Sequence, residues 1–108
     1  MDKDDELAKN QRFLRETEQV IRIANKEIIH KHVPPISSER IVSFAVSVAK
    51  LRAEYVEAAF KFADVKDAGG EESVYISDLR ECRTNFEEAR DAFIALQRAI
   101  ELGYMAVE

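Results

Sequence analysis

The stretch IVSFAVSVAKLRAEYVEAAFKFADV, from Ile41 to Val65, decides the fold of this chain. Its apolar residues recur at alternating steps of three and four, which is the spacing of one face of an α-helix. The alternation of a half-buried strand is absent, and good helix formers dominate the stretch. We therefore predict a long helix with a continuous apolar seam, called here its main seam, made up of Ile41, Phe44, Val48, Leu51, Tyr55, Ala58, Phe62 and Val65.

Proline and glycine mark both ends of this helix. The only prolines, Pro34 and Pro35, precede it, and Gly69 and Gly70 follow it. Proline cannot continue a helix, whereas glycine readily takes the left-handed conformation that caps a helix C-terminus. Ser37 is suited to cap the N-terminus, because its hydroxyl can accept a hydrogen bond from the first turn. The predicted helix therefore covers about residues 38–67.

The segments on either side carry similar seams and predict two further helices, over about residues 4–32 and 72–104. The start of the last helix is left open between Glu71 and Ser77, since either end of that range suits a first turn. Its seam consists of Leu79, Cys82, Phe86, Ala89, Phe93, Leu96, Ile100 and Gly103. The seam of the first helix is broadened by two apolar residues and interrupted by two polar ones, so that it includes Leu7, Asn10, Phe13, Leu14, Thr17, Val20, Ile21, Ala24 and Ile28.

Short connections make consecutive long helices antiparallel. We therefore expect an all-α fold, an up-down-up bundle of three long antiparallel helices with coiled-coil-like seams. The length of 108 residues suits a single domain, residues 1–108, and no internal repeat or interdomain linker divides it.

A second apolar row runs along the helix of residues 38–67, centred about 150° from the main seam at about 100° per residue. Valine and phenylalanine are unusual on a solvated helix face, so we expect this row to be buried against another surface. Either the chain self-associates, as a symmetric dimer with this helix near the two-fold axis, or a monomer hides the row internally. We favour self-association. The row, called here the second seam, consists of Val42, Val46, Ala49, Ala53, Val56, Phe60 and Ala63.

Composition narrows the class of protein. The chain has 21 acidic and 16 basic side chains and a net charge of −5, which disfavours phosphate backbones and anionic membranes. Charged residues interrupt every apolar run well before the ~18 residues of a membrane span. Cys82 is the single cysteine, and the N-terminal residues lack the apolar region of a signal peptide. We expect a cytoplasmic protein with no membrane segment.

One face of the first predicted helix carries a row of cations, called here the basic stripe: Arg12, Arg15, Arg22 and Lys26. Such a row could meet phosphates or an acidic partner. We expect local neutralisation instead, because Glu16 and Glu18 lie four residues from Arg12 and Arg22. No aromatic residue is interleaved for base stacking. A solvated face is the favoured interpretation, and a nucleic-acid-associated regulator is kept as an alternative.

Catalytic signals are few. Glu27 and His30 have the Glu-x-x-His spacing of ferritin-like metal sites, but such a site needs further inward carboxylates and a second motif, which the sequence lacks. Cys82 on an apolar seam is typical of a buried small hydrophobe rather than a nucleophile. No catalytic residue, metal ligand or cofactor is predicted, although a metal-binding helical-bundle enzyme remains a second alternative.

The sequence thus predicts a small cytoplasmic helical protein–protein interaction module with no evident catalytic activity. Its expected partner is a second copy of itself, as a homodimer or higher oligomer, or another helical protein. The contact surface is expected to be the second seam.

Overall fold

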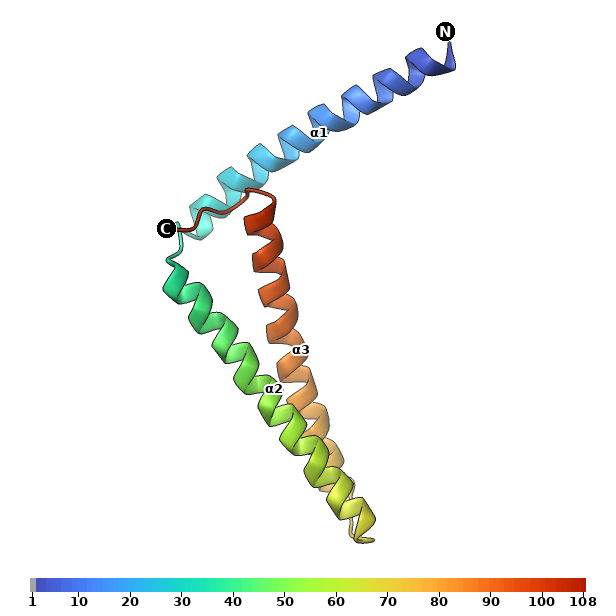
Figure 1. The fold of residues 1–108 in the computed structure, drawn as a ribbon, viewed down its shortest axis with the longest axis vertical. Coiled ribbons are helices and arrows are strands. Elements are labelled where there is room, and N and C mark those ends of the chain that lie inside the picture. Colours follow the sequence, from blue (N-terminus) through green and yellow to red (C-terminus); the bar gives the residue numbers. More distant parts are fainter. Residues whose placement is uncertain (1) are drawn as a thin grey trace. The chain divides into compact units, whose positions relative to one another are not determined.

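The computed structural model describes residues 2–108 and contains three long helices, α1 (Lys3–His32), α2 (Ser38–Asp67) and α3 (Ser73–Glu101) (Figure 1). Within these described residues the only β-type pairing is an isolated bridge between Ile36 and Val107. The prediction of an all-helical chain with three long helices is confirmed. The start of α3, which the sequence left open, is Ser73.

The chain divides into two compact units. One consists of residues 38–97, that is, α2, the turn after it and most of α3. The other consists of α1, the loop that follows it and residues 98–108. Each unit has its own contacts and is described separately below.

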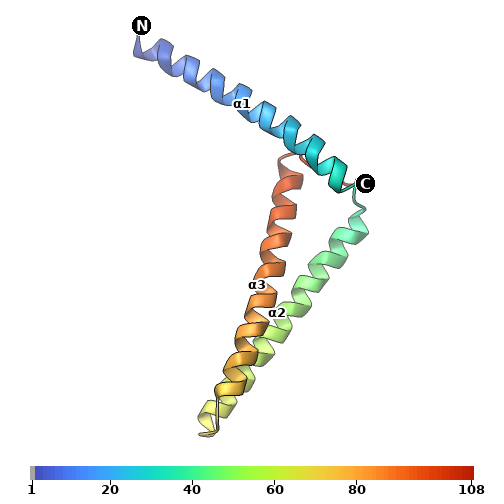
Figure 2. The same cartoon turned by 180° about the vertical axis from the view of Figure 1, so that it is seen from behind.

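In the first of these units, α2 and α3 form an antiparallel hairpin (Figures 1 and 2). Every residue of the main seam of α2 is at least half-buried, and so is every residue of the α3 seam from Leu79 to Leu96. The most deeply buried are Val48 on α2 and Phe86 on α3, each 7% exposed. The two seams therefore pack against each other and form the core of the hairpin.

Aromatic pairs join the two seams. The ring centroids of Phe44 and Phe93 are 5.4 Å apart, and those of Tyr55 and Phe86 are 6.0 Å apart. Both pairs are tilted, which suits the quadrupoles of the rings, and each such pair adds about 0.5–1.5 kcal/mol beyond the burial of its area. The pairs fix which turn of α2 faces which turn of α3.

Both long helices of the hairpin end in the same backbone motif. At the end of α2, Gly69 has φ of 69°, its N–H donates to the carbonyl oxygen of Lys66 and the N–H of Gly70 donates to that of Val65. This pattern of two crossed hydrogen bonds is a Schellman motif, which satisfies carbonyl groups that the helix leaves free. It turns the chain toward the start of α3.

The end of α3 differs from the expectation. The helix stops at Glu101 rather than near residue 104, and Gly103 is exposed with φ of 75°. The N–H groups of Gly103 and Tyr104 donate to the carbonyl oxygens of Ile100 and Ala99, again a Schellman motif. Gly103 is thus a capping residue and not the last residue of the α3 seam.

In the second unit, the C-terminal residues lie beside the loop that follows α1 (Figure 1). The N–H of Ile36 donates to the carbonyl oxygen of Ala106 at 3.3 Å, and the N–H of Glu108 donates to that of Ile36 at 2.9 Å. Tyr104 and Met105 are half-buried here, as is Ile29 near the end of α1. These contacts hold the loop and the C-terminal residues together.

Helix α1 has no buried residue, and its large seam residues are exposed. Its polar seam residue Thr17 donates its hydroxyl to the carbonyl oxygen of Phe13, and Asn25 donates its amide to that of Ile21. Closure of an up-down-up bundle by α1 therefore stays a prediction. None of the helices described in residues 2–108 has the length and apolar character needed to cross a membrane.

Candidate interaction surface

The second seam of α2 is the first candidate site. All seven of its residues are exposed, from 47% for Val46 to 66% for Phe60 among its large side chains. The row points about 150° away from the main seam, so α3 cannot cover both faces of α2. From Val42 to Ala63 the row is about 32 Å long at the helical rise. Within the unit of residues 38–97, this long apolar face of α2 therefore has no cover.

The second seam combines large and small side chains. The large residues are Val42, Val46, Val56 and Phe60, and the three alanines of the row let a second helix approach closely. Full burial of one valine or phenylalanine contributes about 1.5–3 kcal/mol. Four such side chains, each about half to two-thirds exposed, could together stabilise a complex by several kcal/mol.

The remaining face of α2 is a polar ribbon, and some of its polar groups bind one another. Ser47 donates its hydroxyl to the carbonyl oxygen of Ser43, and Lys61 forms an ion pair of 2.8 Å with Glu57. Hydrogen bonding and charge attraction within this ion pair lower the pKa of Glu57 and raise the pKa of Lys61. Both side chains are well exposed, so the pair contributes little to stability. This ribbon is a solvated face.

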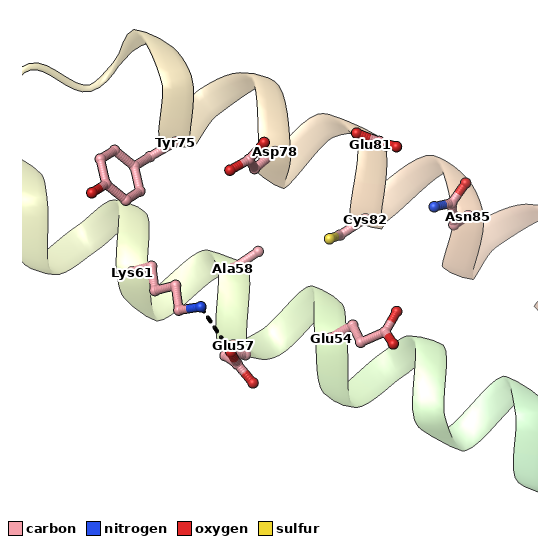
Figure 3. Close-up of a pocket in the computed structure, with 9 residues that line it drawn as sticks. All are labelled: Glu54, Glu57, Ala58, Lys61, Tyr75, Asp78, Glu81, Cys82 and Asn85. Atoms are coloured by element: carbon pink, nitrogen blue, oxygen red, sulfur yellow. Dashed lines mark ion pairs between the residues drawn. The ribbon is translucent and has the colours of Figure 1, made fainter.

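A groove between α2 and α3, which sequence reasoning missed, is the second candidate (Figure 3). It has a volume of about 390 Å³, and the side chains of Ala58 and Cys82 point into it from opposite helices. Four carboxylates and one ammonium group surround them. The complete lining is Glu54, Glu57, Ala58, Lys61, Tyr75, Asp78, Glu81, Cys82 and Asn85.

The groove does not activate its cysteine. Burial raises the pKa of the Cys82 thiol, and the negative charges of Glu54, Glu81, Asp78 and Glu57 raise it further. A raised pKa keeps the thiol protonated near neutral pH, whereas nucleophilic attack requires the thiolate. Neither of the two histidines lines the groove as a possible base. The surroundings of Cys82 therefore disfavour the thiolate form of its side chain.

Glu27 and His30 are both exposed on α1. His30 also lines a small pocket of about 60 Å³ with Pro34, Pro35 and Tyr104. In residues 2–108, no group of three or more histidine, cysteine or carboxylate side chains is placed to hold a metal ion. The two residues are not brought together with any third ligand.

The basic stripe is exposed along α1. The expected ion pairs of Arg12 with Glu16 and of Arg22 with Glu18 are absent from the part of the chain that the structure describes. An exposed pair at this spacing is worth only about 0.3–0.5 kcal/mol, so competing rotamers easily replace it. Arg22 instead lines an open hollow with Tyr104, Arg98 and Glu101. The charges of the stripe are therefore less neutralised than the sequence suggested.

Comparisons with known proteins add no relative: no protein-family model, no curated protein and no solved structure matches this chain. The surfaces described above are the basis for a functional proposal. Within the unit of residues 38–97, the second seam is the longest of these surfaces.

Proposed function

We propose that this chain is a small helical protein–protein interaction module that acts in the cytoplasm and associates with a second copy of itself. One observation carries the proposal: all seven residues of the second seam are exposed, while the main seam on the same helix is packed against α3. Monomeric proteins rarely leave a contiguous apolar row of this length in water. A symmetric dimer is the simplest assembly that covers it.

The shallow core supports the same proposal. Among the described residues, only Val48 and Phe86 are fully buried hydrophobic side chains, whereas sixteen large hydrophobic residues are exposed. A chain of this size has little hydrophobic free energy to spare, so it gains much from burial against a partner. A bundle of long antiparallel helices, completed by self-association, is the architecture that we propose.

Light scattering and sedimentation over a wide range of protein concentration test this function. We expect a mass of at least twice the chain mass of 12.3 kDa, with a stability that rises with concentration. A protein that stays monomeric at the highest concentration, with unchanged stability, contradicts the proposal and directs the search to a different helical partner.

A nucleic-acid-associated regulator is the second candidate, because Arg12, Arg15, Arg22 and Lys26 are exposed and take part in none of the ion pairs found in residues 2–108. A two-fold assembly would present this stripe twice. Phosphate binding must weaken steeply as salt concentration rises, whereas an apolar contact should not. A titration of duplex DNA or RNA at low and moderate salt separates the two candidates. The net charge of −5 opposes such binding.

A further inference from the structure

The hairpin of α2 and α3 carries opposite charges on its two sides. On α3, the carboxylates of Asp78 and Glu81 line the groove between the two helices (Figure 3). Arg80 and Arg83 lie about 160° around the same helix from these carboxylates, at 100° per residue. All four residues belong to the compact unit of residues 38–97, so their arrangement depends on no other part of the chain.

Helix α2 shows the same separation of charge. Glu54 and Glu57 line the groove, and Arg52 lies about 170° around the helix from them at 100° per residue. On α3, Arg90 follows Arg83 by two helical turns and therefore lies on the same side of the helix. Cations from both helices thus gather on the side of the hairpin away from the groove.

A hollow of about 200 Å³ lies among these cations. It is called here the arginine hollow, and it is lined by Tyr55, Ile76, Leu79, Arg80 and Arg83. Its two arginines are exposed, whereas Tyr55 and Leu79 are half-buried residues of the core seams. Charged residues around an apolar centre are typical of protein–protein interfaces. The groove has the same anatomy with the opposite charge.

The charges on the two sides are not neutralised within the hairpin. Five of the charged residues take part in none of the ion pairs found among residues 2–108, namely Arg80, Arg83, Glu54, Asp78 and Glu81. Lys61 is the one cation that lines the groove, and it is already paired with Glu57 at 2.8 Å. A guanidinium group binds a carboxylate well through two parallel hydrogen bonds. These groups cannot meet within one hairpin, because they lie on opposite sides of it.

The two surfaces occupy the same turns of α3. The groove includes residues from Tyr75 to Asn85 of this helix, and the arginine hollow includes residues from Ile76 to Arg83. The two stretches share a midpoint near residue 80, and they are about 15 Å and 10 Å long at the helical rise. A second copy that is displaced sideways, with its helices parallel to those of the first, therefore brings its hollow onto the groove of the first.

We propose that the arginine hollow of one copy docks on the groove of a second copy, so that its two arginines bind the carboxylates of that groove. This inference goes beyond the proposed symmetric dimer, because it uses surfaces other than the second seam. The two surfaces differ, so the contact is heterologous, and each terminal copy keeps one surface free. Assembly therefore continues past two copies unless a ring closes.

Sedimentation of the full chain at low and high salt tests the contact first. Salt weakens contacts between exposed charges, because the Debye length falls from ~30 Å at 0.01 M to ~3 Å at 1 M. We expect assemblies larger than a dimer at low salt and only the dimer formed by the second seam at high salt. An equal mass at both salt concentrations contradicts the contact, whatever that mass is. Salt-dependent assemblies that dissociate to monomers support the contact and contradict the proposed second-seam dimer.

Charge-reversal variants then identify the surfaces. Arg80→Glu with Arg83→Glu makes the hollow acidic, and Asp78→Arg with Glu81→Arg makes the groove basic. All four positions are exposed, and arginine and glutamate have similar helix propensities, so circular dichroism should be unchanged. We expect each variant alone to lose the larger assemblies at low salt, since like charges then meet. An equimolar mixture should restore them, because the acidic surfaces of one variant meet the basic surfaces of the other.

Lys3→Glu with Lys9→Glu is the matched control. It changes the net charge by the same amount as the hollow variant, at exposed positions of α1. Alone, this control should keep the larger assemblies at low salt. If its mixture with the basic-groove variant restores assemblies as fully as the hollow variant does, net charge alone drives association, and the proposal is wrong.

A third measurement separates a contact between copies from one within the chain. If the basic-groove variant expands in small-angle scattering while the parent protein and the variant have the same mass, the basic stripe of the same chain occupies the groove. The proposed contact between copies is then wrong. Failure of the equimolar mixture to restore the larger assemblies contradicts it equally.

Discussion

The guanidinium group of Arg52 on α2 lies 5.1 Å from the ring centroid of Phe86 on α3. A second guanidinium, from Arg90, lies 5.4 Å from the same centroid, and the ring of Tyr55 is in contact distance as well. The Phe86 ring is thus in contact with an aromatic residue of the hairpin core and with two arginine side chains. A cation over a ring contributes about 0.5–1 kcal/mol at exposed sites.

Phe86→Ala should therefore destabilise the hairpin more than loss of either cation. We expect a loss of about 3–5 kcal/mol in the free energy of unfolding, because a buried aromatic side chain is replaced by a cavity. Arg52→Ala should cost only about 0.5–1 kcal/mol. Denaturant unfolding followed by circular dichroism measures both. Equal losses for the two variants would show that the ring is not the centre of the core.

Ala53→Glu and Leu51→Glu test whether α2 has two independent seams. Ala53 is exposed on the second seam, whereas Leu51 is half-buried in the main seam. Glutamate costs only a few tenths of a kcal/mol in helix propensity relative to alanine, but an unpaired charge in a dry interface costs several. We expect Ala53→Glu to stay helical with a smaller sedimenting mass and Leu51→Glu to unfold.

Ser43→Glu is the matched control for Ala53→Glu. It adds the same charge to the same helix, on the exposed polar ribbon. Mass and stability should both stay near those of the parent protein. If Ala53→Glu behaves like this control, the second seam is an ordinary solvated face, and the interaction proposal loses its main support.

The Cys82 thiol should titrate above its ordinary pKa in the folded protein. Its pKa is raised first by burial and then by the nearby carboxylates of Glu54 and Glu81. The unfolded chain therefore ionises first as pH rises, so this contribution to stability is complete below the ordinary thiol pKa and is lost as pH rises through the folded value. Alkylation by iodoacetamide near neutral pH should be slower for the folded protein than for the chain in urea.

A pH series of the alkylation rate gives the thiol pKa directly. The midpoint for the folded protein should lie above that of the urea-unfolded chain. A folded midpoint at or below the unfolded one would mean that the groove stabilises the thiolate, contrary to its negative charges.

Gly69→Ala tests the turn between α2 and α3. A methyl group at this position meets no atom within 4 Å, so the cost comes from the positive φ alone. A left-handed backbone costs a non-glycine residue about 1–2 kcal/mol, and asparagine tolerates it better than alanine. We expect Gly69→Ala to lower the free energy of unfolding by about that amount and Gly69→Asn to lower it less. Equal stability of all three proteins would show that the turn relaxes.

The hydrophobic period was sufficient to predict the packed part of the fold. The main seam of α2 and the α3 seam up to Leu96 are the faces that the hairpin buries, and on both helices large apolar residues recur there at steps of three and four. The same period misled at Gly103, which fits the repeat by position but caps the helix through its left-handed backbone. The spacing of apolar residues along a sequence contains no information about the backbone conformation at each position.

The groove between α2 and α3 could not be predicted from the sequence, for a different reason. Asp78 and Glu81 lie on one flank of the α3 seam, and Glu54 and Glu57 lie on one flank of the main seam. Whether these flanks meet depends on the register between the helices, which the ring pairs determine only in the folded hairpin. The absent ion pairs of Arg12 and Arg22 were equally unpredictable, since each is worth about as much as thermal energy.

The hydrogen bonds of Ile36 with Ala106 and Glu108 have a consequence for the order of folding. They close a loop of chain that contains all of α2 and all of α3, whereas the hairpin contacts form across a short turn. Closing a long loop costs more chain entropy than closing a short one, and non-local contacts form more slowly. The hairpin should therefore assemble first, and residues 106–108 should dock on the loop that follows α1 last.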